Sequence, residues 1–328
     1  MSEIERAAEL LRQGRLVAFP TETVYGLGAD ATNPLAIERI YQTKGRPNTN
    51  PLIVHVASAE IARRYAADWP LAALRLAERF WPGPLTIVLP KNPIIPDNAT
   101  AGLGTVGLRV PNHPLALELL RAVDRPLAAP SANRSTRVSP TTARHVGEEF
   151  PQSEAAGGAA GNEPAMILDG GACEVGIEST VLDLSGETPT ILRPGGIMAG
   201  ELKAVIGPVV TRSASVDAVT AATSPGQQNV HYAPHTPTYR FERGQMTMIK
   251  GSGIGVILLG SPRTAKGWEM VAAMSNDPIE YAKLLYTTLR WFDSEGLRAI
   301  YVEMPPDELG WAAVRDRLMR ATRPIETA

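Results

Sequence analysis

Apolar residues between positions 3 and 12 recur every three or four places, and this spacing predicts an amphipathic helix. Ser2 is a candidate N-cap for this helix, and Gly14 is expected to end it. A second helix is predicted to begin at Asn33-Pro34, because asparagine is a favoured cap and proline is favoured in the first turn. Each prediction rests on local spacing and capping chemistry alone.

Further helices are predicted to start at Ser58 and at Ser139-Pro140. Short apolar runs predict strands at 16–19, 52–56, 85–89, 105–110, 127–129, 165–169, 177–184 and 190–192. Strands and helices alternate irregularly along this part of the chain. The pattern therefore predicts an α/β fold with a mixed, twisted β-sheet and flanking helices.

A regular β-α-β-α alternation follows residue 238. Strands are predicted at 255–260 and 299–302, and helices at 277–292 and 310–321. Residues 201–238 show little periodicity and include the stretch SPGQQNVHYAPHTP, which is typical of a linker. We therefore expect a domain at 1–200, a linker at 201–238 and a small α/β domain at 239–328.

Composition narrows the classes of protein. The 328 residues are 44% hydrophobic and 20% charged, with a formal net charge of −2, which disfavours both disorder and a globally basic nucleic-acid binder. The lone cysteine, Cys173, excludes an intramolecular disulfide. Neither a leader-like segment nor an 18-residue apolar run is present, so we expect a cytoplasmic protein without membrane contact.

The sequence lacks the common nucleotide-binding motifs. Gly102, Gly104 and Gly107 match G-x-G-x-x-G, but the following Leu-Arg-Val-Pro is strand-like where that motif needs a helix. A glycine-rich turn is the better interpretation, and a P-loop sequence is absent. The histidines at 231 and 235 have metal-ligand spacing, but Pro234 and Pro237 prevent a helix there and disfavour a zinc site.

Polar loops that follow predicted strands or helices are the better candidates for chemistry. Lys44 and Arg46 lie on a glycine–proline loop, where they either converge on a polyanion or stay solvated. Similar candidates are the turn at 20–28, the Ser/Asn loop at 129–135, and Arg193. Because no nucleophile–base pair is evident, this set suits a reaction driven by orientation and charge neutralisation on a phosphate-bearing ligand.

Several motifs follow one another along the first 200 residues. They are PTETVYGLGADA (20–31), KGRPNTNPLIVHV (44–56), WPGPLTIVL (81–89), TVGLRVPNHP (105–114), APSANRS (129–135), SPT (139–141), GIESTVLDL (176–184) and ILRPGGI (191–197). Their order and spacing resemble the YrdC-like threonylcarbamoyl-adenylate synthase family. HYAPHTP (231–237) and the α/β tail resemble the longer members, which have a C-terminal Rossmann-like domain.

The resemblance implies a nucleotidyltransferase that converts L-threonine, bicarbonate and ATP into L-threonylcarbamoyl-AMP and pyrophosphate. Mg²⁺ would accompany ATP. The product would pass to a transferase machinery that modifies the adenosine beside the tRNA anticodon, and a weak contact with RNA could accompany this transfer.

The family's residue roles carry over to matching positions. Lys44 and Arg46 would act on the triphosphate as the catalytic cations. The remaining nucleotide contacts would be Asn50, Thr105, Ser131, Asn133, Ser139, Arg193 and Tyr232. Threonine would be bound by Thr23, His55, Arg109 and Ser179. No metal ligand is expected in the protein itself.

Two further expectations concern single residues. Tyr232 would fold over the nucleotide and make the linker a lid. Thr136 stands where many relatives have glycine, a residue that permits a positive φ or a close ligand approach.

Two alternative functions remain. A non-catalytic module that binds double-stranded RNA or tRNA would need many cations and aromatic rings, and aromatic residues make up only 5% of the chain. A carbamoyl transferase using carbamoyl phosphate would be expected to have additional domains ahead of residue 1.

Overall fold

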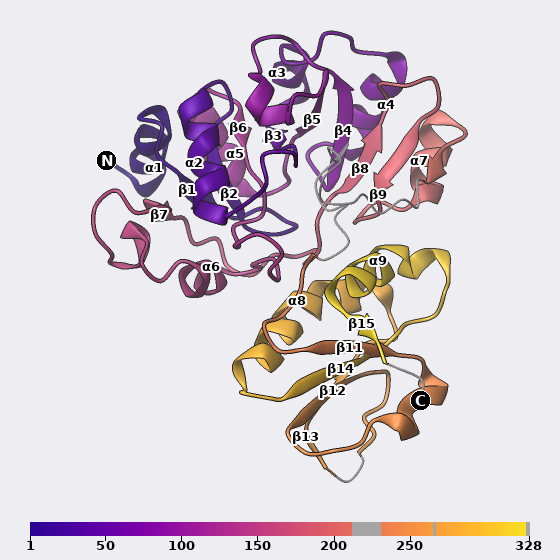
Figure 1. Ribbon diagram of the computed structural model, residues 1–328. Helices are drawn as coiled ribbons and strands as arrows, with labels where there is room; N and C mark the ends of the chain where they lie inside the picture. The colour runs from indigo at the N-terminus through magenta and orange to yellow at the C-terminus, as the bar shows by residue number, and fades with distance from the viewer. Residues whose placement is uncertain (212–230, 265–266, 326–328) are drawn as a thin grey trace. The chain divides into compact units, whose positions relative to one another are not determined.

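A computed structural model describes residues 1–211, 231–264 and 267–325 (Figure 1). They form two compact units. The N-terminal unit comprises Met1–Ser135, Pro140–Glu174 and the described part of Glu178–Asn229. The C-terminal unit comprises Thr136–Ser139, Val175–Ile177 and the described part of Val230–Ala328. Two short pieces of the N-terminal sequence therefore pack with the C-terminal unit.

The N-terminal unit is built on a ten-stranded mixed sheet, as the sequence predicts. Its order is β10-β9-β8-β4-β5-β3-β6-β2-β1-β7. The strands are β1 Val17–Phe19, β2 Gly26–Asp30, β3 Ile53–His55, β4 Leu85–Pro90, β5 Thr105–Arg109, β6 Leu127–Ala128, β7 Met166–Ile167, β8 Thr180–Asp183, β9 Thr190–Arg193 and β10 Val210–Thr211. Strand β3 runs parallel to β5, whereas β4 runs antiparallel to β5 and parallel to β8.

Helices flank this sheet. They are α1 Glu3–Arg12, α2 Pro34–Lys44, α3 Ala59–Arg63, α4 Leu71–Phe80, α5 Pro114–Val123, α6 Ala143–Glu149 and α7 Ala199–Ile206, with 3-10 turns η1 Asp97–Thr100 and η2 Glu154–Ala156. Ser2 caps α1 through a capping box with Glu5, as predicted. Asn33 caps α2, and Gly45 ends that helix at φ +60.

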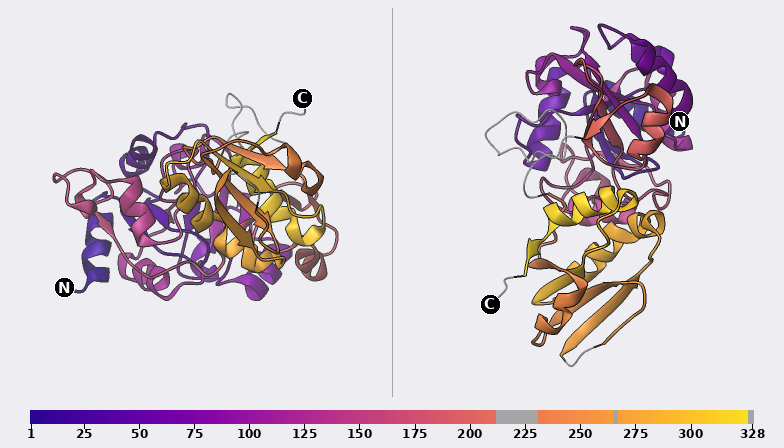
Figure 2. Two further views of the ribbon diagram at one scale, coloured as in Figure 1. Left: turned by 90° about the horizontal axis from the view of Figure 1, so that it is seen from below. Right: turned by 90° about the vertical axis from the view of Figure 1, so that its right-hand side faces the viewer.

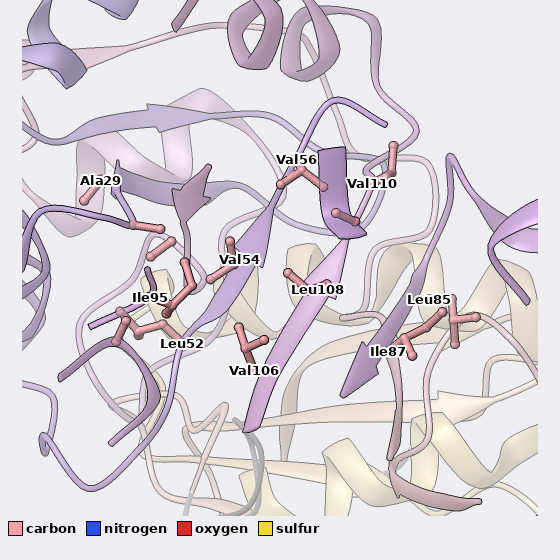
Figure 3. Close-up of a cluster of buried hydrophobic side chains, with 14 of the residues drawn as sticks. Ala29, Leu52, Val54, Val56, Leu85, Ile87, Ile95, Val106, Leu108 and Val110 are labelled. Atoms are coloured by element: carbon pink, nitrogen blue, oxygen red, sulfur yellow. The ribbon is translucent and has the colours of Figure 1, made fainter. Parts of the chain in front are cut away.

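The two faces of the sheet differ in character. Val54 of β3, Leu108 of β5 and Ile87 of β4 point to one face of the sheet and belong to the large apolar core of the unit (Figure 3). On the other face Ile53, Val88, Val181 and Leu192 form a small apolar cluster. Because successive residues of a strand point to opposite faces, the polar side chains of Thr86, His55 and Arg109 share the face of the small cluster.

The C-terminal unit contains a parallel sheet in the order β13-β12-β14-β11-β15 (Figure 1). Figure 2 shows the strands of this sheet from two further directions. Its strands are β11 Thr238–Phe241, β12 Ile254–Leu259, β13 Trp268–Met274, β14 Ala299–Glu303 and β15 Arg323–Pro324. Its helices are α8 Pro278–Ser294 and α9 Ala312–Ala321, with 3-10 turns η3 Arg243–Met248 and η4 Leu309–Trp311. Tyr281, Leu285, Leu289 and Phe292 form the buried stripe of α8.

Three features differ from the sequence prediction. Ser139-Pro140 does not begin a helix: α6 begins at Ala143, and its cap is Thr142, whose side chain accepts a hydrogen bond from the backbone of His145. The expected linker starts too early, because α7 occupies part of it and β10 pairs with β9. Residues 212–230, half of that expected linker, lie outside the described residues. Strands β2 and β13 and helices α4 and α5 were not predicted.

Among the described residues, no helix combines the length and the apolar character that crossing a membrane requires.

Candidate functional site

The polar residues singled out in the N-terminal sequence gather at opposite ends of the parallel pair β3 and β5. His55 and Arg109 are register partners at the carboxyl ends of the two strands. Lys44, Arg46 and Asn50 precede β3, and Thr105 begins β5. Thr105 and Arg109 are four positions apart along β5, which in a strand is a span of about 13 Å. We call Lys44, Arg46, Asn50, Ser131 and Asn133 the Lys44 group, and Glu22, Thr23, His55, Arg109 and Ser179 the Arg109 group.

Lys44 is the last residue of α2, and its ammonium is enclosed by main-chain carbonyls. Nζ donates to the carbonyl of Ser131 at 2.6 Å and to the carbonyl of Asn133. The Lys44 carbonyl in turn accepts from the backbone N–H of Ser135 at 2.8 Å. Burial, with a smaller contribution from the charge of Arg46, lowers the pKa of Lys44 well below its usual value. The end of α2 is thereby tied to the loop at 129–135.

Arg46 is held by its own loop. Its Nε donates to the carbonyl of Asn50 at 3.2 Å, and its Nη2 donates to the carbonyl of Pro51 at 3.0 Å. The Asn50 side chain is buried beside it, and neither its oxygen nor its nitrogen has a hydrogen-bond partner within the described parts of the chain. Burying an unsatisfied polar atom costs about 1–3 kcal/mol, so this amide is well suited to bind a ligand.

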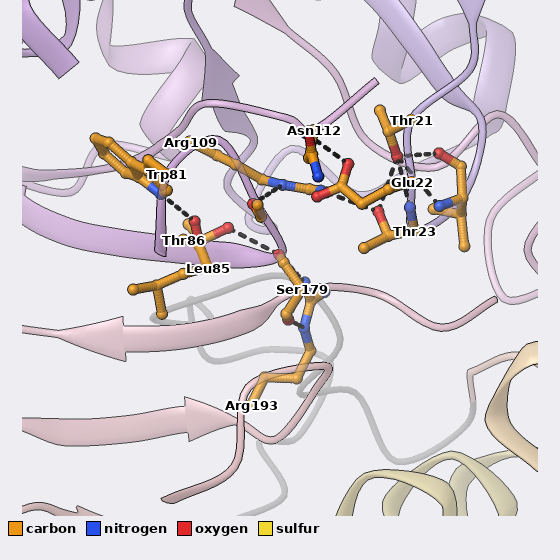
Figure 4. A network of polar contacts seen from close by, with 12 residues as sticks. Thr21, Glu22, Thr23, Trp81, Leu85, Thr86, Arg109, Asn112, Ser179 and Arg193 are labelled. Atoms are coloured by element: carbon orange, nitrogen blue, oxygen red, sulfur yellow. Dashed lines mark hydrogen bonds and ion pairs between the residues drawn. The ribbon is translucent and has the colours of Figure 1, made fainter. Parts of the chain in front are cut away.

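Arg109, at the end of β5, forms a buried ion pair. Its Nη2 lies 2.7 Å from Glu22 Oε1, and both side chains are at most 5% exposed. Nη2 also donates to Thr23 Oγ1 at 3.0 Å, and Nε donates to the carbonyl of Gly83 at 3.3 Å (Figure 4). Glu22 Oε2 accepts from the backbone N–H of Asn112 at 3.0 Å. The Arg109 group therefore presents one cation and one anion side by side.

His55 is the neutral member of the Arg109 group. Burial first, and the charge of Arg109 second, lower its pKa to about 3. Its ring meets Phe19 edge-on, with centroids 6.2 Å apart, and its Nδ1 has no hydrogen-bond partner among the described residues. The imidazole is therefore uncharged at neutral pH and available to a polar ligand atom.

Ser179 connects two more strands to this end of the sheet. Its Oγ lies 2.8 Å from Thr86 Oγ1 of β4. Arg193, the last residue of β9, donates from Nε and Nη2 to the Ser179 carbonyl at 3.1 and 2.9 Å, and from Nη2 to Ser179 Oγ at 3.1 Å (Figure 4). Arg193 was expected with the nucleotide residues, yet its described contacts are with Ser179, an expected threonine residue.

The remaining expected residues lie elsewhere. Thr105 is half-buried at the start of β5, and Ser139 is fully buried in the segment that packs with the C-terminal unit. Tyr232 also belongs to that unit: its ring stacks on Tyr286 with centroids 5.6 Å apart, and the guanidinium of Arg317 lies 5.3 Å from its centre. The role of Tyr232 as a lid stays a prediction.

Glu22 and Thr86 were not among the predicted site residues. Glu22 sits in a turn that directly follows a strand, and a carboxylate expected to be buried there needs a cation. That signal could have identified Glu22, although not its partner Arg109, which lies 87 positions away in the sequence. Thr86 offered only a hydroxyl in an otherwise apolar strand.

Thr136 has a backbone conformation that glycine would adopt without strain. Its φ is +71, a region that β-branched residues rarely occupy. Its carbonyl accepts from the backbone N–H of Ala233 at 2.9 Å. The loop thus keeps a glycine-type geometry with threonine in place.

Comparisons with known families and sequences cover nearly the whole chain. A family model described as "Telomere recombination" matches residues 9–195, and one described as "Threonylcarbamoyl-AMP synthase, C-terminal domain" matches residues 197–322. The threonylcarbamoyl-AMP synthase of Pyrococcus abyssi is 40% identical, over 98% of this chain and 94% of its own length. The enzyme of the same name from Bacillus subtilis is 41% identical, over 97% and 92%.

Solved structures give the same result for the fold. The crystal structure of P. abyssi Sua5 complexed with L-threonine superposes with a TM-score of 0.87 at 38% identity, covering 98% of this chain and 96% of that one. A variant of the same protein, with a histidine and the next residue, a tyrosine, both replaced by alanine, gives a TM-score of 0.85. The two matched models together, and each of the two relatives by itself, span nearly the whole sequence, and the chain therefore belongs to the family of two-domain, YrdC-like threonylcarbamoyl-AMP synthases.

Proposed function

We propose that the chain joins L-threonine, bicarbonate and ATP into L-threonylcarbamoyl-AMP and pyrophosphate. The observation that carries this proposal is the buried ion pair of Arg109 and Glu22, at the opposite end of β3 and β5 from the cations Lys44 and Arg46. One end suits a zwitterion and the other suits a polyanion, which are the charge states of an amino acid and of a nucleoside triphosphate. The threonine complex of the P. abyssi relative supports the assignment of the amino acid.

On this proposal the Arg109 group binds threonine. The threonine carboxylate would accept from the guanidinium fork of Arg109, and its ammonium would approach Glu22. Thr23 and Ser179 would offer hydroxyls, and neutral His55 would offer a ring nitrogen without adding charge. Arg193 would keep Ser179 in place through the hydrogen bonds that it already makes.

The Lys44 group would bind ATP. Carbonyl oxygens carry no formal charge, so they orient Lys44 and Arg46 without neutralising them, and both cations can act on a triphosphate. Asn50, Ser131 and Asn133 would provide amide and hydroxyl contacts. Further contacts would come from Thr105, Ser139, Arg193 and Tyr232.

The reaction follows from this arrangement of charges. The bound threonine ammonium first gives up a proton to solvent water. The neutral amine then adds to bicarbonate and releases water, which leaves a carbamate. A carbamate oxygen then attacks the α-phosphorus of ATP, and pyrophosphate leaves with its negative charge stabilised by Lys44 and Arg46. The protein supplies orientation and charge stabilisation, and none of its side chains becomes covalently attached.

Mg²⁺ would arrive with ATP. Among the described residues there is no group of three or more His, Cys, Asp or Glu side chains that could hold a metal ion. The ion would therefore rest on the phosphate oxygens and water, and we assign no step to it.

We further propose that the product passes to a transferase machinery acting on tRNA, with at most a weak direct contact to RNA. Tyr232 would close over bound ATP. The sequence contains one His-Tyr pair, His231-Tyr232, and such a pair is what was replaced in the solved variant of the P. abyssi relative.

The decisive experiment measures pyrophosphate release with ATP, threonine and bicarbonate, and repeats it with each omitted in turn. We expect release only when all three are present, together with a new adenylate on an anion-exchange column. Release that persists without threonine or without bicarbonate would refute the proposal.

A further inference from the structure

Two segments of the N-terminal sequence, Thr136–Ser139 and Val175–Ile177, pack with the C-terminal unit. We call them the first and second held segments. Both segments are short, and each lies within three positions of a proposed substrate-binding residue. Asn133 lies three positions before the first held segment, and Ser179 lies two positions after the second.

The second held segment approaches the backbone of α8 closely. A Cβ added to Gly176 would lie 2.5 Å from both Cα and the carbonyl oxygen of Lys283, and 2.7 Å from the carbonyl oxygen of Ala282. Such distances are too short for any side chain, and backbone atoms cannot swing aside as a flexible side chain would. Gly176 also has φ +77. Glycine is therefore required here for conformation and for the close approach to α8.

The first held segment is fixed by hydrogen bonds. Arg290 of α8 donates from Nη2 to the carbonyl of Val138. Ala233 donates its backbone N–H to the carbonyl of Thr136 at 2.9 Å, and Arg137 forms a parallel bridge with Ala233. One helix, α8, thus contacts both held segments, through Arg290 on one and through its backbone at Ala282 and Lys283 on the other.

We infer that α8 positions both substrate groups, with Gly176 and Arg290 as the positioning residues. The inference rests on the proposed function and extends it to the C-terminal unit. Because Ile177 is two residues from Ser179, a displaced second held segment moves the hydroxyl that Arg193 and Thr86 contact. Because Thr136 is three residues from Asn133, a displaced first held segment moves the carbonyls that hold Lys44.

The inference predicts that the two contacts affect different substrates. Gly176→Ala should raise KM for threonine about tenfold or more, since misplacing a binding group by about 1 Å can cost up to a hundredfold. Its KM for ATP should change less than about twofold. Arg290→Ala should show the reverse, and Arg290→Lys should restore part of the ATP affinity because it keeps a donor on α8.

Gly171→Ala is the matched control for Gly176→Ala. Gly171 has a similar φ of +80, and no atom lies within 4 Å of an added Cβ. Both variants bear the strain of alanine at positive φ, but only Gly176→Ala meets α8. Thermal unfolding of each variant shows whether the fold persists. If Gly176→Ala does not fold, the ATP and threonine KM values of Arg290→Ala and Arg290→Lys decide the matter.

The outcomes separate this inference from the proposed function. Equal threonine KM in Gly176→Ala and Gly171→Ala, with an active wild type, would overturn the role of Gly176. Equal loss for both substrates in Arg290→Ala, without recovery in Arg290→Lys, would reduce Arg290 to a structural role. A wild type whose pyrophosphate release ignores threonine would instead overturn the proposed function.

Discussion

The Lys44 group and the Arg109 group both bury cations, but they surround them differently. Lys44 and Arg46 donate to main-chain carbonyls, whereas Arg109 faces the carboxylate of Glu22. A carbonyl orients a cation without adding an opposite formal charge. A carboxylate cancels the charge of the cation and offers one of its own. The contrast teaches that a buried arginine or lysine indicates a ligand's charge only when its partners are considered with it.

Among the substitutions considered, replacing Lys44 should have the largest effect, and that effect should be on kcat/KM for ATP. Lys44→Met keeps the length of the side chain and removes its charge, so we expect kcat/KM for ATP to fall by about 10²–10³. Lys91→Met is the control, because Lys91 is also a lysine but pairs with the exposed Asp97. Steady-state pyrophosphate release measures both. Near-normal turnover of Lys44→Met would show that the carbonyl-held cation does not act on the triphosphate.

Removing the anion of the Arg109 group should affect the other substrate. Glu22→Gln keeps the shape of the side chain and leaves Arg109 unneutralised, so the ammonium of threonine loses its partner. We expect KM for threonine to rise by about 10–100-fold, the loss of one hydrogen bond to a charged group. KM for ATP should stay within about twofold of the wild type. An equal rise for both substrates would contradict the division into two groups.

The histidine of the Arg109 group should appear in the pH dependence of stability. Its pKa is about 3 in the folded protein and 6.5 in the unfolded chain, so the unfolded chain binds more protons between these values. The free energy of unfolding therefore falls as the pH drops below 6.5, by about 3 kcal/mol at pH 4 from this residue.

Urea unfolding at pH 7.5, 5.5 and 4.5 tests this expectation. His55→Gln does not titrate, so its stability should decline less steeply than that of the wild type below pH 6.5. Parallel curves at all three pH values would show that His55 is not held neutral by burial.

Replacing Thr136 should have the smallest effect, a change in the free energy of unfolding. Thr136→Gly removes a β-branched residue from φ +71, where a side chain costs about 1–2 kcal/mol, and adds about 0.5–1 kcal/mol of chain entropy. We expect a net gain in stability of up to about 1 kcal/mol in urea unfolding. Thr136→Ala, which keeps a Cβ, should gain less. A loss of stability in Thr136→Gly would mean that the threonine side chain contributes contacts that offset its backbone strain.

Local features of the fold could be predicted from the sequence. The capping box of Ser2 and the Asn33-Pro34 start are chemistry within four residues, and both were found as predicted. Ser139-Pro140 has the same local pattern as Asn33-Pro34, yet it begins no helix. Residue 139 packs with the C-terminal unit, and tertiary contacts of this kind override a local capping signal.

The candidate site could be predicted as a set of residues but not as two groups. Motifs identify Lys44, Arg109 and Arg193 individually. They do not show that the carbonyls of a loop about 90 residues away enclose Lys44, or that Arg193 contacts Ser179. Such partners depend on strand order and register, which no short window of sequence contains. The same is true of Gly176, whose need for glycine comes from a helix more than 100 residues later.

The ends of the two sheets have a consequence for self-association. Within the described residues, both edge strands of the large sheet, β7 and β10, are two residues long, and so is β15, which includes Pro324. A short edge strand, or one that contains proline, offers few backbone hydrogen-bonding groups with which another strand could pair. β13 is different: it is seven residues long, Trp268–Met274, and in the described part of the chain it has a neighbouring strand on one side only. Aggregation by strand addition is therefore expected to begin at β13, and a proline or lysine introduced there should suppress it.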